Sequence, residues 1–529
     1  MIDEGRPTTV PKAFVFSPGD SRQATAAWIQ PHLDEALERL PGLLTAAGYE
    51  VCILTPSLVQ SQTEAMRLAR QIKRLAQPGD VIMPLCIGWG LPGIAGSVFT
   101  YLKSAGAMTK LRTLLVSNLL EQYPGYVQAA AIAHPLAEMS LPFDRVIIMD
   151  WDDETVVAQF AEFREMSLIT RPWSGAEPEV ITPTVDDVRA AREVLRLMRG
   201  NIYGPIGGSS MLMGQGYPPR WLLERLGIGL QDIGSGEFFS RVAHIPEWRA
   251  KAAMKFCFDH GLENVDVPED QLLEQMRYLL TYKELIGDYG LSFGGIQGQF
   301  DMTRIAPADD LSTALIMSIC RPESDGRAIV WATENDAWGA LTMRLLQVAV
   351  QVVHARPWWS VGFHDLRHIL PNRHGGVEEW LIALLNSGAL NAYDLTGRND
   401  TLDGVFSMVQ DPAYMPHGGG CSGGEMVAQD HVTWARLMPV GWQGAALQMG
   451  CGEIVPVSSG QRLEHYGLLD PNWPLGLLRT YCDPWRFLTT HVPNHTHTVP
   501  VDGILGVLAA VSEILNWGQI VMGATKPSA

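Results

Sequence analysis

The sequence predicts a mixed α/β protein in three parts: two Rossmann-like doubly wound domains, followed by a β-rich, barrel-like C-terminal domain. Three observations lead to this prediction. Apolar β-prone runs alternate with helical runs through the first third of the chain. Turn-forming residues at 171–183 precede a second helix and strand unit with glycine-rich loops. Short strand candidates with turn signals, at residues 432–439, 445–449 and 453–457, occur in the last third. We therefore expect domains at residues 1–171, 172–354 and 355–529.

The first domain is predicted from its alternation of strands and helices. AFVFS, YEVCILT, GDVIMPLCIG, RTLLVSN and RVIIMD are strand candidates, and the long helical run that follows the first of them ends at Gly48. The loop after the third strand exposes Trp89 between glycines. A tryptophan in such a loop is as typical of a domain or subunit contact as of a ligand contact. The loop after the first strand contains Arg22.

Composition excludes several classes of protein. The chain has 529 residues, of which 47% are hydrophobic and 18% are charged, an ordinary globular balance. A net charge of −18 without a Lys/Arg cluster argues against nucleic acid or an anionic membrane as a partner. The seven cysteines show no framework spacing and fit a reducing compartment. With neither a signal-like N-terminus nor a long apolar stretch, we expect a soluble, cytoplasmic protein.

The second domain is predicted to present neutral amides on a loop. It opens with the helix VDDVRAAREVLRLMRG, and a strand with a glycine loop follows. That loop completes neither a P-loop nor a dinucleotide fingerprint, so we expect a tight turn bordering a site. Further on, Gln297 and Gln299 follow an apolar segment. Their amides suit hydrogen bonds to sugar hydroxyls, although an amide that only ties down a loop is an equally good interpretation.

The segment from Ile329 to His368 is predicted to bring two carboxylates together. An apolar run delivers Glu334 and Asp336 to the start of a helix, which is expected from about Trp338 to Val353. A second β-prone run, Trp358 to Phe363, delivers Asp365. If both strands are parallel, their carboxyl ends share one edge of a sheet and the carboxylates converge. The alternative is that such residues only cap the helix, which Asp336 fits well. A carboxylate in the apolar surroundings of Glu334 must be paired, hydrogen-bonded or bound to a metal.

Three histidines near the C-terminus are candidate ligands. His491, His495 and His497 lie in the segment THVPNHTHTVPVDG. A lone histidine is more often structural than a ligand, so this group is suggestive without being diagnostic. Carboxylates together with imidazole form a mainly hard ligand set, which suits Mn²⁺, Mg²⁺ or a similar ion.

These motifs resemble those of the L-fucose isomerase family. The resemblance rests on ATENDAWGALTM with FHDLRH, and on GGSSMLMGQ, FGGIQGQFDMTR, LLNSGALN, GGGCSGG and PNHTHTV, which follow the family's order through the last two thirds of the chain. It implies that Glu334 and Asp365 are both metal ligands and the acid/base pair. It also implies that His495 is the third ligand, with His497 as the fallback. The family resemblance further implies a homo-oligomer, expected to be a hexamer, with sites at subunit contacts.

The resemblance also implies a set of sugar-contacting residues. One position departs from the family's pattern, because Cys421 stands where the family usually has an aromatic hydroxyl residue, and this alters the expected pocket. The substrate-binding residues implied in this way are Gln297, Ser387, Asn494, Trp89, Cys421, Trp473 and Arg22.

The function expected on these grounds is a metal-dependent aldose–ketose isomerase. It would interconvert L-fucose, D-arabinose or a related aldose with its ketose through an enediol, while a hydride shift is an alternative route that the sequence leaves open. Two other functions are considered. One is an isomerase or epimerase of a modified sugar on the same scaffold, which Cys421 favours. The other is a non-catalytic sugar-binding protein, which would require loss of the metal triad.

Overall fold

The computed structural model describes residues 10–119, 125–171, 179–374, 377–385, 388–457 and 473–526. The chain divides into two compact units. Unit 1 contains Met1–Glu177, Met211–Gly214 and Thr489–Asn494, and unit 2 contains Pro178–Ser210, Gln215–Leu488 and His495–Ala529. Most of the second predicted domain therefore belongs to the same compact unit as most of the third.

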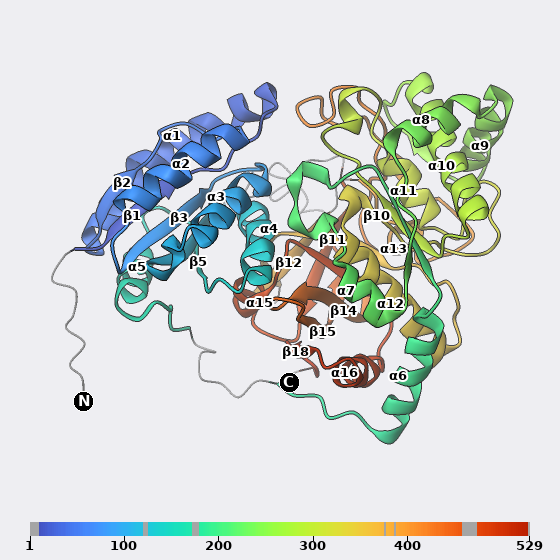
Figure 1. The fold of residues 1–529 in the computed structure, drawn as a ribbon. Coiled ribbons are helices and arrows are strands. Elements are labelled where there is room, and N and C mark those ends of the chain that lie inside the picture. Colours follow the sequence, from blue (N-terminus) through green and yellow to red (C-terminus); the bar gives the residue numbers. More distant parts are fainter. Residues whose placement is uncertain are drawn as a thin grey trace. The chain divides into compact units, whose positions relative to one another are not determined.

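Unit 1 is built on a parallel sheet of five described strands in the order β2-β1-β3-β4-β5 (Figure 1). Helices follow the strands in alternation, as the sequence predicts. The strands are β1 (Lys12–Phe16), β2 (Glu50–Ile53), β3 (Asp80–Cys86), β4 (Leu111–Asn118) and β5 (Asp144–Ile148). The helices are α1 (Gln23–Ala46), α2 (Gln62–Leu75), α3 (Pro92–Ser104), α4 (Gly125–Glu138) and α5 (Glu154–Met166).

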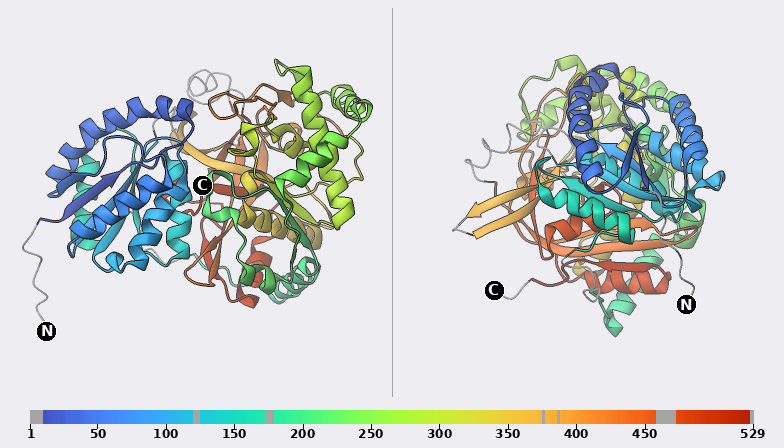
Figure 2. Two further views of the ribbon diagram at one scale, coloured as in Figure 1. Left: turned by 45° about the horizontal axis from the view of Figure 1, so that its top comes forward. Right: turned by 90° about the vertical axis from the view of Figure 1, so that its left-hand side faces the viewer.

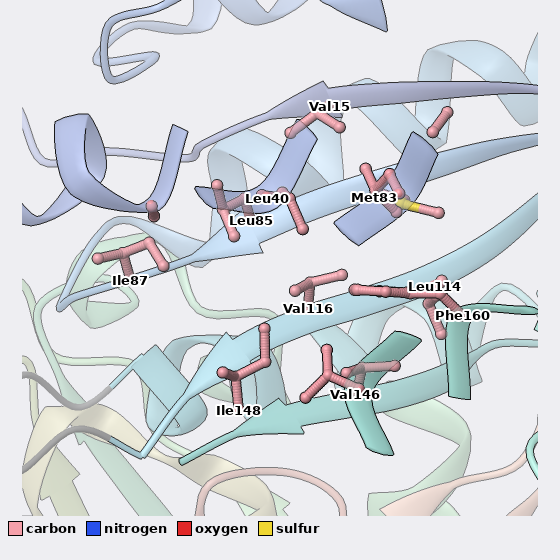
Figure 3. Close-up of a cluster of buried hydrophobic side chains, with 14 of the residues drawn as sticks. Val15, Leu40, Met83, Leu85, Ile87, Leu114, Val116, Val146, Ile148 and Phe160 are labelled. Atoms are coloured by element: carbon pink, nitrogen blue, oxygen red, sulfur yellow. The ribbon is translucent and has the colours of Figure 1, made fainter. Parts of the chain in front are cut away.

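The core of unit 1 forms where α1 and α5 cover one face of this sheet. Val15, Met83 and Val116 point from the strands toward Leu40 of α1 and Phe160 of α5 (Figure 3). Because side chains alternate across a strand, these positions are spaced so that each strand turns its apolar residues to the helices. Burial of this set stabilises the packing of the two helices on the sheet.

Unit 2 contains a second parallel sheet, whose four described strands run in the order β10-β9-β6-β7. The loops after β6, β9 and β10 contain three of the polar motifs that the sequence analysis singled out. The strands are β6 (Ile202–Ile206), β7 (Gly229–Leu230), β9 (Phe293–Ile296) and β10 (Trp331–Ala332). The helices of this region are α6 (Val185–Met198), α7 (Arg220–Leu226), α8 (Ser235–His244), α9 (Glu247–Asp259), α10 (Glu269–Tyr289), α11 (Asp310–Ile316) and α12 (Ala337–His354).

Within the described part of the chain, six antiparallel strands of unit 2 close into a barrel. The pairing β14-β17-β11-β12-β16-β15 is closed by pairing of β15 with β14, and β18 adds to β15 in parallel. Figure 2 shows the β11–β12 hairpin, in yellow-orange, reaching beyond the other strands. The strands are β11 (Gly362–His374), β12 (Val377–Leu385), β14 (Gln429–Pro439), β15 (Ala445–Val455), β16 (Leu475–Thr480), β17 (His495–Val499) and β18 (Gly518–Val521). The remaining short strands and helices are β8 (Glu263–Asn264), β13 (Phe406–Ser407), α13 (Ala392–Thr396), α15 (Pro484–Thr490) and α16 (Leu505–Ile514).

The mixed α/β class with parallel sheets is confirmed, as is the barrel in the C-terminal part. Two details of the predicted strands are wrong. Residues 445–449 and 453–457 were expected as two strands, whereas β15 runs continuously from Ala445 to Val455. The β-prone run from Trp358 is not a parallel strand, because β11 begins only at Gly362 and pairs antiparallel with β12 and β17. Asp365 therefore lies inside a barrel strand and not at the end of a parallel one.

Among the described residues, no helix combines the length and the apolar character that a membrane crossing requires.

One buried carboxyl group, that of Asp394 in α13, makes stability depend on pH. Burial raises the pKa of Asp394 to about 6, although the Asn391 amide donates a hydrogen bond to it. The folded state therefore holds this proton between about pH 4 and pH 6 while the unfolded chain has lost it. Since each pKa unit corresponds to about 1.4 kcal/mol, the shift of roughly two units lowers the free energy of unfolding by about 3 kcal/mol as the pH rises through this window.

Replacing Asp394 by Asn is expected to remove that loss. The amide oxygen of the new side chain can still accept the hydrogen bond from Asn391, so the variant should be about 3 kcal/mol more stable than the wild type at pH 7.5 and similar to it at pH 4. Urea unfolding at the two pH values measures the difference. Asp430→Asn, at an exposed position, is the control. An Asp394→Asn variant with the same pH dependence as the wild type would contradict the assignment.

Candidate functional site

The three predicted metal ligands lie together in unit 2. The Nε2 atom of His495 lies 3.2 Å from Oε2 of Glu334 and 3.2 Å from Oδ1 of Asp365. The side chains of Glu334 and His495 are almost fully buried, and that of Asp365 is 11% exposed. The predicted convergence of the two carboxylates therefore occurs around one imidazole nitrogen.

Two different sheets bring these three residues together. Asp365 and His495 are register partners on the antiparallel strands β11 and β17, so their side chains are neighbours on the same face of the barrel sheet. Glu334 comes from the parallel sheet, in the short turn that follows β10. Glu334 therefore follows a strand of the parallel sheet, whereas Asp365 lies on a strand of the barrel. The sequence had suggested that both carboxylates follow parallel strands.

The turn that carries Glu334 has an unusual backbone. Glu334 and Asn335 have φ angles of 55° and 50°, in the left-handed region that residues with a side chain adopt at a cost of order 1 kcal/mol each. Asn335 is held there by hydrogen bonds, accepting one from Tyr203 and donating one to the Gly208 carbonyl at 3.1 Å. Such strain persists only where the surroundings impose it, and it aims the Glu334 carboxylate at His495. The glycine loop after β6 thus borders the site as a tight turn, as predicted.

The two glutamines after β9 make different contacts. Gln299 donates from Nε2 to Oε1 of Glu334 at 2.8 Å, whereas Gln297 contacts the Ser209 carbonyl at 3.4 Å. Both amides are buried, and within the described part of the chain their carbonyl oxygens accept no hydrogen bond. The sequence placed both residues on one loop but did not reveal that Gln299 is the one that touches the catalytic candidate.

Asp336 is the N-cap of α12, which confirms the structural interpretation of that residue, but it does more than cap the helix. Its Oδ1 accepts the backbone N–H of Gly339 at 2.8 Å, and its Oδ2 accepts from Nδ1 of His495 at 2.6 Å. Arg436 of β14 pairs with both carboxylate oxygens, at 2.6 and 3.0 Å. Arg436 was not predicted from the sequence, although a charged residue within the apolar run VTWARLMP is a signal of a buried, paired charge.

The electrostatics of the cluster show an excess of negative charge. Burial raises the pKa of Glu334; His495 opposes this rise, and the charges of Asp365 and Asp336 add to it. Burial acts to lower the pKa of His495, yet the same three carboxylates hold it well above the usual value. Asp336 is the exception, because Arg436 and His495 overcome its burial and keep its pKa far below the usual range. A cation bound between Glu334 and Asp365 would relieve the remaining repulsion.

The donor atoms meet a simple test of fit for such a cation. Two neighbouring ligands of one octahedral ion, each about 2.1 Å from it, lie about 3 Å apart. The 3.2 Å separations from His495 Nε2 to the two carboxylate oxygens are close to this spacing. Among the described residues, however, no group of three or more His, Cys, Asp or Glu side chains is placed so that it could hold a metal ion. The two distances from His495 Nε2 therefore suit such an ion, but the three side chains together do not form a metal site in this arrangement.

The fallback ligand, His497, faces in another direction. Its Nε2 lies 3.1 Å from the guanidinium of Arg436, and burial together with that positive charge lowers its pKa well below the usual value. His497 therefore accepts a hydrogen bond from Arg436.

Several of the other predicted sugar contacts belong to unit 1. Trp89 is buried, and its Nε1 donates to Sδ of Met211 at 2.9 Å. Arg22 forms a buried bidentate pair with Asp20. Asn494 is also buried in unit 1, and it directly precedes the ligand candidate His495.

The remaining predicted contacts belong to unit 2. Cys421 and Trp473 share one apolar cluster, in which Trp473 donates to Gln410 and the Cys421 thiol to the Met408 carbonyl. Ser387 lies outside the described residues.

Comparison with known proteins adds no relative. The chain matches none of the protein-family models and none of the curated proteins against which it was searched.

Proposed function

We propose that this protein is a divalent-metal-dependent aldose–ketose isomerase of the L-fucose isomerase type. The observation that carries the proposal is the convergence of Glu334 and Asp365 on Nε2 of His495. The sequence motifs that resemble that family supply the same three residues. One line of argument rests on motif order and the other on interatomic distances.

Charge balance supports a divalent ion in particular. Asp336 and Arg436 neutralise each other as a buried pair. To act as a metal ligand His495 must lose its ring proton at Nε2, and the ionised Glu334 and Asp365 would then carry two negative charges in surroundings of low polarity, where unpaired charge is costly. One Mn²⁺ or Mg²⁺ would balance them, with Glu334, Asp365 and His495 as its protein ligands.

The chemistry follows from what these groups can hold and move. When bound, the ion would polarise two adjacent sugar oxygens and stabilise the negative charge that develops on them. Glu334 and Asp365 carry the proton transfers between neighbouring carbons that an enediol route requires. Gln299 orients the Glu334 carboxylate through its N–H donor. The free carbonyl oxygens of Gln297 and Gln299 are available to accept hydrogen bonds from sugar hydroxyls.

The proposal extends to the architecture and assembly. The strand order of unit 1 and the parallel sheet of unit 2 are compatible with two Rossmann-like domains. We further propose a homo-oligomer, a hexamer, with its sites at subunit contacts. The residues proposed to contact the sugar, besides Gln297, are Trp89, Arg22, Asn494, Ser387, Cys421 and Trp473. A modified sugar is the second candidate substrate, because Cys421 is a small residue packed among apolar side chains.

Proton exchange followed by NMR tests the function directly. Metal-free protein resupplied with Mn²⁺ would be incubated in D₂O with a panel of aldoses that includes L-fucose and D-arabinose. We expect metal-dependent ketose formation with deuterium at the exchanging carbon. If Mn²⁺ binds but none of these sugars is converted, the result would indicate that the substrate is a modified sugar. Failure to bind Mn²⁺ would contradict the proposed site.

Replacing Gln299 by Leu is expected to lower kcat by about 10- to 100-fold, the usual effect of removing a partner of a metal ligand. The reason is that Glu334 loses its N–H donor and the orientation that this bond imposes. Gln297→Leu is the matched comparison, since Gln297 does not contact Glu334 in this way, and it should mainly raise KM. Steady-state kinetics at saturating Mn²⁺ separates the two effects. Equal changes in kcat for the two variants would contradict the distinction.

A further inference from the structure

The carboxylate of Asp336 has no room left for a metal ion. It accepts four hydrogen bonds, from Gly339 N–H, from His495 Nδ1 and twice from Arg436. A carboxylate offers about four lone-pair positions, so all of them are used. Asp336 is therefore a partner of the proposed ligand His495 and not a fourth ligand.

The geometry around His495 leaves one ring nitrogen for the site. Its Nδ1 is directed at Asp336, and its Nε2 is directed at Glu334 and Asp365. The ring also packs against Phe363, with centroids 4.5 Å apart. A histidine whose Nδ1–H is donated to a carboxylate presents the Nε2 lone pair to a cation, and its ring orientation is fixed.

Arg436 holds Asp336 in this position. Both side chains are fully buried, and Arg436 also donates to His497 on the strand that carries His495. The packing is tight on the helix side too. A Cβ atom on Gly339 would lie 2.8 Å from both Arg436 Nη1 and Asp336 Oδ2, so the first turn of α12 has space only for glycine there.

We propose that Asp336 and Arg436 act as a positioning pair, which fixes the ring of His495 so that Nε2 faces Glu334 and Asp365. This inference rests on the proposed function, because the pair orients a ligand for the ion of that same site. A purely structural role makes a different prediction, since buried ion pairs contribute little net stability and need not affect metal binding.

The test compares Asp336→Asn with a matched control in unit 1. Asp144 is also buried, accepts backbone N–H groups and pairs with Arg171 at 2.9 Å, so Asp144→Asn makes the same chemical change away from the triad residues. Two readouts are independent of turnover. One is the Mn²⁺ dissociation constant from calorimetry, and the other is the ¹⁵N chemical shifts of the His495 ring, assigned by their loss in His495→Gln.

We expect Asp336→Asn to weaken Mn²⁺ binding by about 10- to 100-fold and to shift the His495 ring signals, whereas Asp144→Asn changes neither. Unchanged Mn²⁺ affinity and unchanged ring signals in Asp336→Asn would overturn the inference. If the wild type binds no Mn²⁺ but Asp336→Asn still alters the ring signals, the positioning pair stands and the proposed function fails. If Asp336→Asn does not fold, the same two measurements are made on Arg436→Lys. This variant keeps the buried positive charge but loses the bidentate contact with Asp336.

Discussion

Replacing Glu334 by Gln is expected to lower turnover by about 10²- to 10⁴-fold, the usual contribution of a general acid or base. The amide cannot take up or release the proton that moves between neighbouring sugar carbons. It is also a weaker ligand for a hard divalent ion than a carboxylate. The fold should be preserved, because the amide oxygen can still accept the hydrogen bond from Gln299.

Ketose formation at saturating Mn²⁺ and sugar measures this loss. Glu453→Gln is the matched control, since Glu453 lies on the barrel strand β15 and pairs with Arg479 at its rim. Thermal unfolding of both variants should show that the folded state persists. Wild-type turnover in Glu334→Gln would remove Glu334 from the mechanism, whichever metal is bound.

The sequence predicted the local elements of this protein better than their pairing. The helix expected from Trp338 to Val353 is α12, Ala337–His354, and it begins at the N-cap Asp336 as predicted. Propensity, periodicity and capping depend on residues close in the chain, so they can be interpreted from sequence alone. The barrel depends on pairing between β11 and β17, which lie more than 100 residues apart, and no local pattern encodes that register.

In the candidate site, too, the residues themselves could be predicted from the sequence, but their tertiary contacts could not. Glu334, Asp365 and His495 were identified from residue type and motif, and the structure brings them together by a route that the sequence did not indicate. Arg436 and the contact of Gln299 with Glu334 were missed, because each depends on a partner chosen by tertiary packing. The irregular turn at Glu334 was also unforeseen, since no glycine marks its left-handed backbone.

Adding Mn²⁺ to the metal-free protein is expected to raise its free energy of unfolding by about 2.7 kcal/mol at a concentration 100 times the dissociation constant. An ion that binds only the folded state stabilises it by mass action. In this site it would also offset the repulsion between the buried carboxylates of Glu334 and Asp365. Urea unfolding with and without Mn²⁺ measures the gain, and a chelator should reverse it.

The variant Asp365→Asn tests whether the stabilisation by Mn²⁺ arises at this site. The substitution keeps the size of the side chain but removes the carboxylate that lies 3.2 Å from His495 Nε2, so the metal-free variant should be less stable than the metal-free wild type. The stabilisation by Mn²⁺ should be largely lost, because the ion then has one carboxylate instead of two. The difference in stability between the two proteins should therefore widen on addition of Mn²⁺. An equal gain in both proteins would place the ion elsewhere, and a wild type that gains nothing would mean that the cluster is maintained without a metal.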